Sequence, residues 1–438
     1  MNIRQEAYHT VVKILKDKEY SDTLLHQKAK RIKESQENLA LFYNLTKGIV
    51  KMHLKLDYII QQFTDPRRYQ STDLKTRCLL YLGLYQIIFM NSIPEHAAVH
   101  ETVQLAKTLM SPATADFVNA ILRSYLREPA VNYPENIALR IAYEHSYPPE
   151  LIRQWIDLWG AEETEYLALF FNENPELHLR VNTTATSQAK LIHYFSKRDV
   201  RLEPSSASPN LLTTKQGEEA LDAVAFSEGY FSVQDTSAAL IVELLSPQPE
   251  ENILDLFAAP GGKCTYIAEL MNNTGEVVAV DKIPNKMKLL KQAADRLQLT
   301  NIKQVVADSF TYGPVAPAYD RVLVDAPCSG WGVFGRKSDL RWQVHQNLPE
   351  LLKLQEKALI HAANFVKPGG VLVYSTCTMN PAENELQVQK FLKQNGRYSL
   401  VNAAEYIPER FTAAGFLVTM PYKHNMDGAF AAKMVRSS

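Results

Sequence analysis

The chain has 438 residues, of which 46% are hydrophobic and 22% are charged, as in ordinary globular proteins. Its length suggests two to four domains that each bury a core. These proportions exclude a disordered or fibrous protein, and the sequence has no run of eighteen apolar residues that would predict a transmembrane helix. The first twenty residues hold scattered charges and no apolar stretch typical of a secretory signal. We therefore expect a cytoplasmic protein without membrane contact.

Cysteine usage and charge distribution narrow the class further. Four cysteines (Cys78, Cys264, Cys328 and Cys377) are too few for a disulfide framework and form no C-x-x-C pair, so no metal site is expected. The net charge is −1, but residues 1–130 carry 18 Lys and Arg against 13 Asp and Glu. A basic N-terminal part on a mildly acidic remainder favours a polyanionic partner for that part.

Residues 1–128 show helical periodicity. Apolar side chains recur at three- and four-residue spacing, and the stretch 78–88 is apolar on nearly all sides, which predicts the central helix of a small bundle. Further helices are expected over 97–110 and 115–126. Pro129 and Pro134 then end the bundle, so residues 129–140 are predicted to form a linker.

The following segment, residues 141–235, has a mixed pattern. Helices are expected over 151–158 and 164–172 and a short strand over 178–181, whereas residues 203–210, rich in Ser and Pro, are predicted to form a loop. The pattern predicts a small α+β domain with no evident chemistry of its own.

From about residue 250, short apolar runs alternate with helical stretches. The helices are expected over 285–297 and 349–365, and the predicted strands are 253–257, 277–280, 302–306, 322–324 and 371–374. Such alternation predicts a parallel α/β sheet. Ligands of such sheets bind beyond the carboxyl ends of the strands, so we expect the chemistry there.

The ends of the first four predicted strands carry a Gly-rich turn and three acids. The turn, residues 258–263, lets a ligand approach the backbone. It matches neither the dinucleotide nor the P-loop motif, which argues against a nicotinamide enzyme and an NTPase. The next three strands end at Asp281, Asp308 and Asp325. Although a lone acid there is often only solvated, three together suit a nucleoside ligand without phosphates, and the cationic methyl donor S-adenosylmethionine fits.

Two cysteines follow the fourth and fifth predicted strands in polar loops. If these strands are neighbours, about 5 Å apart, the thiols of Cys328 and Cys377 face one cleft. Carbon 5 of a pyrimidine is not nucleophilic, but thiolate addition at carbon 6 makes it so, and a second thiol could assist the later elimination. Asp325 could hydrogen-bond the edge of the base. The residue pattern does not decide which thiol is the nucleophile. Cys78 is expected in a core, and Cys264 could also be packing.

The motifs resemble those of a known family. The stretches ILDLFAAPGGK, VVAVDK, ADS, VDAPCSG and YSTCTMNPAENE resemble successive motifs of bacterial RNA (cytosine-5) methyltransferases. Residues 1–128, with IPEHAAVHETVQLAK and FVNAILR, resemble the NusB-type RNA-binding helical domain. In the middle segment, the stretches SYPPELIRQW, LRVNT and FSVQDTSAAL also resemble the pattern of these methyltransferases. Over essentially the whole chain, the sequence resembles the ribosomal RNA small-subunit methyltransferase B family (Sun/Fmu).

The resemblance implies a multidomain fold. A NusB-like all-α bundle would span 1–130, a small α+β RNA-binding segment 141–235, and a Rossmann-like class I methyltransferase domain 236–438. It also implies a monomer that uses S-adenosylmethionine to methylate carbon 5 of a specific cytosine in 16S ribosomal RNA, through a covalent cysteine–carbon 6 adduct.

The same resemblance implies roles for individual residues. Cys377 would be the nucleophile, Cys328 would assist product release, and Asp325 would lie beside the base and the transferred methyl group. Asp281 would hold the ribose and Asp308 the adenine side. The rest of the cofactor site would be lined by Phe257, Ala258, Ala259, Pro260, Gly261, Gly262 and Lys263.

Some residues depart from the family's usual pattern, and some alternatives stay open. Phe257, Trp331 and Gly335 stand where other residues are usual, which affects the expected RNA contacts of the loop after the fourth strand. Phosphate or base contacts there are predicted for Arg336, Lys337, Arg341 and Trp342. The alternatives are the same reaction on transfer RNA, a non-catalytic RNA-binding or antitermination factor, and a nicotinamide oxidoreductase.

Overall fold

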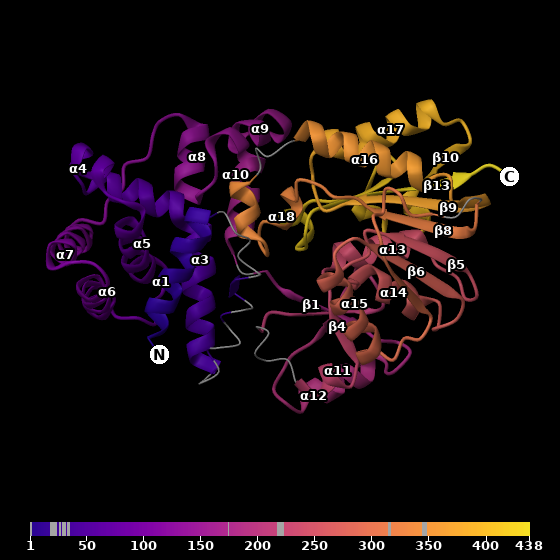
Figure 1. The fold of residues 1–438 in the computed structure, drawn as a ribbon, viewed down its shortest axis with the longest axis horizontal. Coiled ribbons are helices and arrows are strands. Elements are labelled where there is room, and N and C mark those ends of the chain that lie inside the picture. The colour runs from indigo at the N-terminus through magenta and orange to yellow at the C-terminus, as the bar shows by residue number, and fades with distance from the viewer. Residues whose placement is uncertain are drawn as a thin grey trace. The chain divides into compact units, whose positions relative to one another are not determined.

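The structure is a computed structural model of the chain (Figure 1). It describes residues 2–17, 24, 25, 28, 32, 36–173, 175–216, 223–313, 317–343 and 348–438. The chain forms two compact units, one of residues 1–173 with 336–344 and one of residues 174–335 with 345–438. We call them the helical unit and, because the second holds the strand ends at which the sequence analysis expects the chemistry, the catalytic unit.

The helical unit is built around α5 (Leu74–Phe89), which is buried on nearly all sides as its apolar sequence predicts. Asp73 caps its first turn by accepting a hydrogen bond from Thr76 N, and Ser111 caps α7 in the same way. Among the described helices, none combines the length and apolar character needed to cross a bilayer. The other helices that the structure describes in this bundle are α1 (Ile3–Asp17), α3 (Gln36–Gln62), α4 (Pro66–Ser71), α6 (Glu95–Leu109) and α7 (Pro112–Arg127).

Three more helices belong to the helical unit: α8 (Ile137–His145), α9 (Pro149–Trp159) and α10 (Ala161–Asn172). The Tyr58 ring of α3 stacks on Tyr143 of α8, with ring centroids 4.4 Å apart. Asn136 caps α8, so the predicted linker 129–140 is wrong at its end, where residues 137–140 are helical. The helices expected over 151–158 and 164–172 correspond to α9 and α10.

The catalytic unit begins with a small antiparallel sheet in the order β2-β3-β1-β4. Its core joins Leu179, Leu212 and Phe231 of the sheet to Phe195 of the helix beside it. The elements are β1 (Leu177–Val181), α11 (Gln188–Ser196), β2 (Glu203–Pro204), β3 (Leu211–Thr214), α12 (Ala223–Ser227) and β4 (Phe231–Val233).

Among the described residues, nine strands form a second, larger sheet. Its parallel part has the order β7-β6-β5-β8-β9, so β5 lies between β6 and β8 and the strand order reverses there. In doubly wound folds, this reversal is where ligands bind. The parallel strands are β5 (Asn252–Leu256), β6 (Glu276–Asp281), β7 (Ile302–Val306), β8 (Tyr319–Asp325) and β9 (Val366–Thr376).

Helices cover both faces of this sheet, as Figure 1 shows. Neighbouring residues of a strand point to opposite faces, so Val277 packs with α13 to α15 and Val278 with α16 and α17. These helices are α13 (Thr236–Leu245), α14 (Gly262–Leu270), α15 (Pro284–Arg296), α16 (Leu348–Ala362) and α17 (Glu385–Gln394).

The sheet is mixed, which corrects the purely parallel sheet that the alternation predicted. β13 pairs antiparallel with β9, β10 and β12. Only the four-residue helix α18 lies between β12 and β13, and it is too short for the crossover that a parallel pair needs. Residues 367–370, which lie between the predicted helix 349–365 and the predicted strand 371–374, belong to β9, so this strand begins earlier than predicted. The C-terminal elements are β10 (Tyr398–Val401), β11 (Thr412–Ala413), β12 (Phe416–Thr419), α18 (Pro421–His424) and β13 (Ala429–Arg436).

Candidate active site

The thiols of Cys328 and Cys377 face each other at the carboxyl ends of β8 and β9. The two strands are parallel neighbours, with Asp325 opposite Ser375 in register. The two segments that follow these strands therefore leave the sheet side by side. The Sγ atoms of Cys328 and Cys377 lie 3.3 Å apart, within hydrogen-bond distance for sulfur. Both cysteines are partly exposed and free of disulfides. The structure thus brings together the two thiols that the sequence placed at these strand ends.

Asp325 and Lys263 form an ion pair beside the thiols. Lys263 Nζ lies 2.8 Å from Asp325 Oδ2, and Ser375 Oγ donates to Oδ1 of the same carboxylate at 3.0 Å. Burial lowers the pKa of Lys263, but Asp325 outweighs burial and the net direction is upward, with Cys377 adding to it. Lys263 is therefore a fixed positive charge that joins the Gly-rich turn to β8.

Glu383, in the segment after Cys377, holds the two cysteine loops together. Its fully buried carboxylate accepts hydrogen bonds from Ser329 N at 2.8 Å, from Ser329 Oγ and from Gln355 Nε2 at 2.9 Å. Ser329 Oγ also lies 2.8 Å from Thr378 Oγ1. Glu383 lies in the motif YSTCTMNPAENE, but the sequence alone predicted no role for it. The sequence feature that could have pointed to Glu383 is its position six residues after Cys377, and this spacing predicts no role without knowledge of the contacts.

The two thiols have different electrostatic surroundings. The pKa of Cys328 is raised well above its usual value, first by the hydrogen bond with Cys377, then by burial and by the negative charges of Cys377 and Glu383. Cys377 instead interacts with the positive charge of Lys263. The negative charge of Glu383 therefore disfavours a thiolate at Cys328, whereas the positive charge of Lys263 acts close to Cys377.

The Gly-rich turn after β5 has two residues with a left-handed backbone, Phe257 and Gly261. Gly261 has φ +111°, and a Cβ there would lie 2.7 Å from Leu290 Cγ. Phe257 adopts a left-handed φ of 66° and its ring packs against Phe310. Lys263 is the second residue of α14, where the chain leaves the turn and becomes helical. Ala258, Ala259, Pro260 and Gly262 complete the turn between these residues, as the sequence analysis placed them.

The other two predicted acids differ in burial. The Asp281 carboxylate is 8% exposed and accepts hydrogen bonds from Ala259 N at 3.3 Å and Ile283 N at 2.9 Å, so it is fixed against the Gly-rich turn. Asp308 is exposed, and its Oδ1 accepts from Phe310 N at 2.9 Å. Both lie at carboxyl ends of neighbouring parallel strands, β6 and β7.

Asp255 is an acid that the sequence reasoning missed. It lies within β5 and is 1% exposed, and neither carboxylate oxygen has a hydrogen-bond partner among the residues that the structure describes. Burial raises its pKa well above the usual value, and Asp325 adds to the rise while Lys263 opposes it. A buried carboxyl without partners is costly. Together with the tight glycine turn and buried Asp281, it fits a ligand that brings hydrogen-bond donors and positive charge, as S-adenosylmethionine does.

Arg180 of β1 joins the small sheet to the start of α14. Its guanidinium is fully buried and forms a bidentate pair with Glu269, with N–O distances of 2.9 and 2.8 Å. It also donates to the carbonyl of Gly262 at 2.8 Å and to Thr265 Oγ1 at 3.0 Å. The sequence contained this residue in LRVNT, but only the packing shows that it anchors the Gly-rich turn.

The predicted RNA contacts of residues 336–342 are corrected in part. Arg341 is fully buried in the helical unit, with its guanidinium 4.0 Å from the Tyr147 ring centroid, and donates to Asn172 Oδ1 at 2.9 Å. Trp342 Nε1 donates to Val50 O at 2.9 Å. Both side chains are used for packing because this segment lies against the helices rather than in solvent. Lys337 is exposed and Arg336 partly so.

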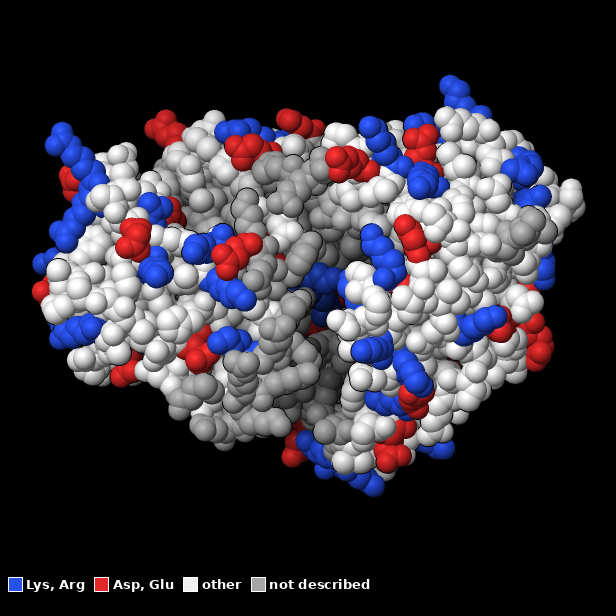
Figure 2. Space-filling view, viewed as in Figure 1, with Lys and Arg blue, Asp and Glu red and all other residues white. Residues whose placement is uncertain are grey.

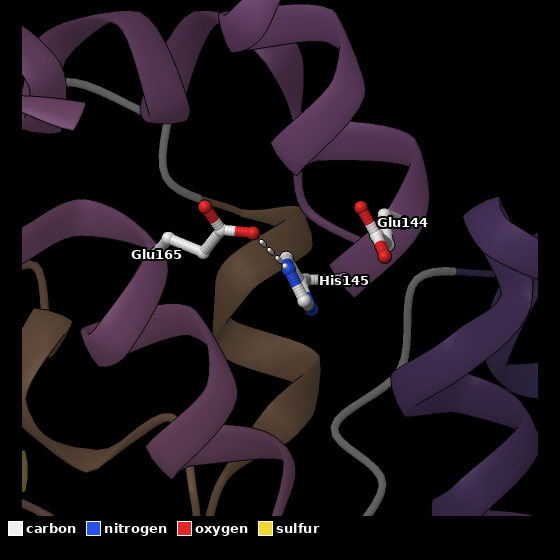
Figure 3. Close-up of side chains that lie close together, drawn as sticks. All are labelled: Glu144, His145 and Glu165. Atoms are coloured by element: carbon white, nitrogen blue, oxygen red, sulfur yellow. Dashed lines mark hydrogen bonds and ion pairs between the residues drawn. The ribbon is translucent and has the colours of Figure 1, made fainter. Parts of the chain in front are cut away.

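Glu144, His145 and Glu165 are a group of the helical unit whose ligand atoms lie close enough together to hold a metal ion. Figure 3 shows His145 and Glu165 directed toward each other, with Nε2 and Oε1 3.3 Å apart. Arg140, however, binds Glu165 through both of its terminal nitrogens at 2.7 Å and Glu144 at 2.9 Å. Both carboxylates are already paired with this guanidinium, so the cluster is an ion-pair network of the helical unit.

The fold and the strand-end residues together define a class of protein. The strand order, a glycine turn after the first parallel strand and acids after the following strands describe a Rossmann-like methyltransferase. The family model of the 16S rRNA methyltransferase RsmB/F matches residues 242–435, the NusB family model residues 1–127, and the ferredoxin-like domain of the RsmF/B-like methyltransferases residues 147–218.

Comparison with individual proteins defines the family. The chain is 35% identical to the probable ribosomal RNA small subunit methyltransferase B of Synechocystis sp. over 100% of both chains. It is 34% identical to the probable protein of that name in Bacillus subtilis, over 99% of this chain and 98% of the relative. The crystal structure of PH0851 superposes with a TM-score of 0.81 at 24% identity, covering 99% of both chains. The chain therefore belongs to the ribosomal RNA small subunit methyltransferase B family.

Membership confirms several expectations from the sequence. The predicted fold class is confirmed, with an N-terminal NusB-type helical part and a C-terminal Rossmann-type methyltransferase part. The cofactor of this methyltransferase is S-adenosylmethionine, as predicted. The alternative of a nicotinamide oxidoreductase, against which the glycine turn already argued, is thereby excluded.

Proposed function

We propose that this chain methylates carbon 5 of a specific cytosine in 16S ribosomal RNA through a covalent adduct between Cys377 and carbon 6 of the base. The observation that carries the proposal is the pair of Sγ atoms 3.3 Å apart at neighbouring strand ends, beside the Lys263–Asp325 ion pair. The names of the relatives in Synechocystis and Bacillus subtilis support small-subunit ribosomal RNA as the substrate.

The electrostatics favour Cys377 as the nucleophile. Because Cys328 lies in the negative field of Glu383 and its pKa is raised, it keeps its proton. Lys263 favours the thiolate at Cys377, and the thiolate is the reactive form of cysteine. Attack of Cys377 Sγ on carbon 6 forms the S–C6 bond and moves electron density to carbon 5. Residue pattern alone left this choice open, and the local charges support the assignment that the family resemblance implied.

Asp325 is placed to act on the base and the cofactor. In the proposal, its carboxylate accepts a hydrogen bond from the N4 amino group of cytosine, which orients the base for addition at carbon 6. S-adenosylmethionine, when bound, supplies the methyl group as an electrophile to carbon 5. The residues that hold it are Asp281 and Asp308 on the nucleoside side and, along the Gly-rich turn, Phe257 to Lys263.

Cys328 is proposed to assist the last step. The carbon 5 proton passes to a base, the C5–C6 double bond returns, and the S–C6 bond breaks with its electron pair on Cys377. The protonated Cys328 donates a hydrogen bond to the departing thiolate at the 3.3 Å separation seen here. A thiol with a raised pKa suits that task because it stays protonated at neutral pH.

The proposed division of labour follows the sequence boundaries. Residues 1–130 form an RNA-binding NusB-like domain, residues 141–235 an α+β RNA-recognition domain and residues 236–438 the catalytic domain, acting as a monomer. The basic charge of the first part supports RNA binding there.

The test combines activity with trapping. The purified chain is incubated with methyl-labelled S-adenosylmethionine and 16S ribosomal RNA, transfer RNA serving as a separate substrate, and label is located by nuclease digestion. We expect label on a single cytosine of 16S ribosomal RNA. Cys377→Ala should abolish transfer, Cys328→Ala should accumulate a protein–RNA adduct, and Cys78→Ala should do neither.

Each other outcome has a definite meaning. Label on transfer RNA alone would replace the substrate but keep the chemistry. An adduct that accumulates in Cys377→Ala and not in Cys328→Ala would reverse the two roles. RNA binding without any label on cytosine would support the non-catalytic RNA-binding factor instead.

A further inference from the structure

Charge alone does not locate an RNA surface on this protein. On the face shown in Figure 2, Lys and Arg side chains are interspersed with Asp and Glu over the described surface of both units. A site for a polyanion must therefore be sought where cations, hydrogen-bond donors and a hollow coincide. One cavity of the catalytic unit, of about 310 Å³, meets this description.

Three parts of the catalytic unit line this cavity. Strands of the small sheet contribute His178 and the loop after β2 contributes Ser206, while Thr236 comes from the start of α13. The C-terminal region contributes Arg410, from the turn before β11, and Lys423 and His424 of α18. No step of the proposed reaction uses these residues.

The positive charges at the cavity exceed the negative ones. Arg410 and Lys423 are exposed, and Arg410 Nη2 donates to Ser206 Oγ at 2.7 Å, which holds the guanidinium at the rim. The pKa of His424 is lowered, first by burial and then by the charges of Lys423 and Arg410. The positive charges of Lys423 and Arg410 therefore both act on the His424 ring. Of the lining residues, only Glu176 carries negative charge.

The less exposed lining offers hydrogen-bond donors. His424 Nδ1 accepts from Met420 N at 2.9 Å, so in the neutral ring the proton is on Nε2, which can donate. His178 is buried, with Nδ1 accepting from Thr236 N at 3.0 Å. Ser205 and Ser206 add hydroxyl groups. Cations with several N–H and O–H donors form the usual environment of a bound phosphate group.

Short hydrogen-bond steps connect the cavity wall to the catalytic loops. Gly332 N donates to Cys377 O at 3.0 Å, and Gly428 N donates to Gly332 O at 2.9 Å. Asp427 N donates to Asp235 Oδ1 at 3.1 Å, and Asp235 caps the helix that begins with Thr236. The segment after α18 therefore touches the loop of Cys328 on one side and the cavity wall on the other.

We propose that this cavity binds a phosphate group of the substrate RNA chain close to the nucleotide held at the two thiols. The inference rests on the proposed function, because it takes RNA to be the substrate at Cys377. Arg410 and Lys423 form the ionic contacts, and His424 donates the neutral hydrogen bond. Because phosphate contacts fix the register of a nucleic acid without reading its sequence, the site positions the target base.

The test measures RNA affinity and its salt dependence with the full chain. The variant is Arg410→Gln with Lys423→Gln. The matched control is Lys393→Gln with Arg397→Gln, an equal loss of charge at exposed residues outside the cavity. The probe is the segment of 16S ribosomal RNA that contains the methylated cytosine. We expect about tenfold weaker binding for the variant and a salt slope reduced by about 1, with neither change in the control.

A second measurement identifies the phosphate. Neutral methylphosphonate replaces the phosphates around the target cytosine one at a time. One replacement should weaken binding by the wild-type chain and have no further effect on the variant, because the two changes remove the same contact. Melting temperature and S-adenosylmethionine affinity should match the control, since neither residue lies in the cofactor site.

The outcomes separate this inference from the proposed function. If the wild-type chain methylates RNA but variant and control bind it equally, the cavity is not a phosphate site and the reaction stands. If the wild-type chain neither binds nor methylates RNA, both proposals fail. Inorganic phosphate and AMP are tested separately. Saturable binding of either one, lost in the variant while RNA affinity is unchanged, would assign the cavity to a small phosphate ligand instead.

Discussion

The cores of the two units and the strand-end edge around Cys328 use the same residue types for different purposes. In the core of the catalytic unit, Arg180 forms a bidentate ion pair with Glu269, and Cys264 packs among apolar side chains. At the edge, the Cys328 and Cys377 thiols face each other beside the Lys263–Asp325 ion pair and the Glu383 carboxylate. The difference teaches that position in the topology, more than residue type, separates a stabilising group from a reactive one.

Alkylation of the thiols tests this comparison most directly. Cys78 and Cys264 are buried in different cores, whereas Cys328 and Cys377 are partly exposed. Core thiols react only when the protein opens, so iodoacetamide should label them at least about a thousandfold more slowly than Cys377. Mass spectrometry of timed digests measures the rates, and urea-unfolded protein is the control. Labelling of Cys264 in the folded protein at the rate of Cys377 would contradict the comparison.

The buried ion pair of the catalytic core predicts a large loss of stability. Removing one partner leaves a buried charge unpaired, so Arg180→Leu should lower the free energy of unfolding by about 3–5 kcal/mol. Replacing both Arg180 and Glu269 with Leu should cost much less. Chemical unfolding, with hydrogen exchange read on β1 and α14 peptides, measures the effect.

The control for that pair is an exposed one. Lys291 and Asp295 form an ion pair at 2.9 Å on the surface of α15, and Lys291→Leu should cost less than about 1 kcal/mol. If Arg180→Leu were no more destabilising than Lys291→Leu, the packing of the small sheet onto α14 would not depend on this pair.

Glu383 predicts the reverse pattern, a loss of rate with little loss of stability. Glu383→Gln weakens the clamp between the cysteine loops, and misplacement of reacting groups should lower kcat by about 10- to 100-fold. It also removes a negative charge that raises the pKa of Cys328. The alkaline fall of the pH–rate profile should therefore move to lower pH. Glu385→Gln, two residues along the chain, is the control, and an unchanged profile in Glu383→Gln would show that Glu383 does not act on Cys328.

The sequence was sufficient for features set by local pattern and strand ends. Strand-end acids and cysteines could be placed from the alternation of strands and helices, because neighbouring parallel strands end at one edge. Three features could not be found this way. The burial of Arg341 depends on Tyr147, almost 200 residues away, and the antiparallel β13 depends on tertiary pairing. The role of Glu383 depends on its contact with Ser329.

The smallest expected effect tests whether the cluster of Figure 3 is a stabilising network. Arg140 lowers the pKa of Glu165 to about 2 from its usual 4.5, and burial opposes that shift. A lowered carboxyl pKa stabilises the fold above the unfolded value and is lost as pH falls through the folded value. Glu165→Gln should therefore destabilise the helical unit by about 1 kcal/mol at neutral pH, and the difference should shrink between about pH 4.5 and pH 2.

Tryptophan fluorescence reports mainly on this unit, because Trp155, Trp159 and Trp342 belong to it, whereas Trp331 alone of the four belongs to the catalytic unit. The exposed Glu135, replaced by Gln, is the matched control and should show no comparable pH-dependent difference. A metal site predicts another result, since zinc would then raise the melting temperature of the wild-type chain and not of Glu165→Gln. The ion-pair interpretation requires that added zinc leave both unchanged, because Arg140 already occupies the carboxylates that the metal would need.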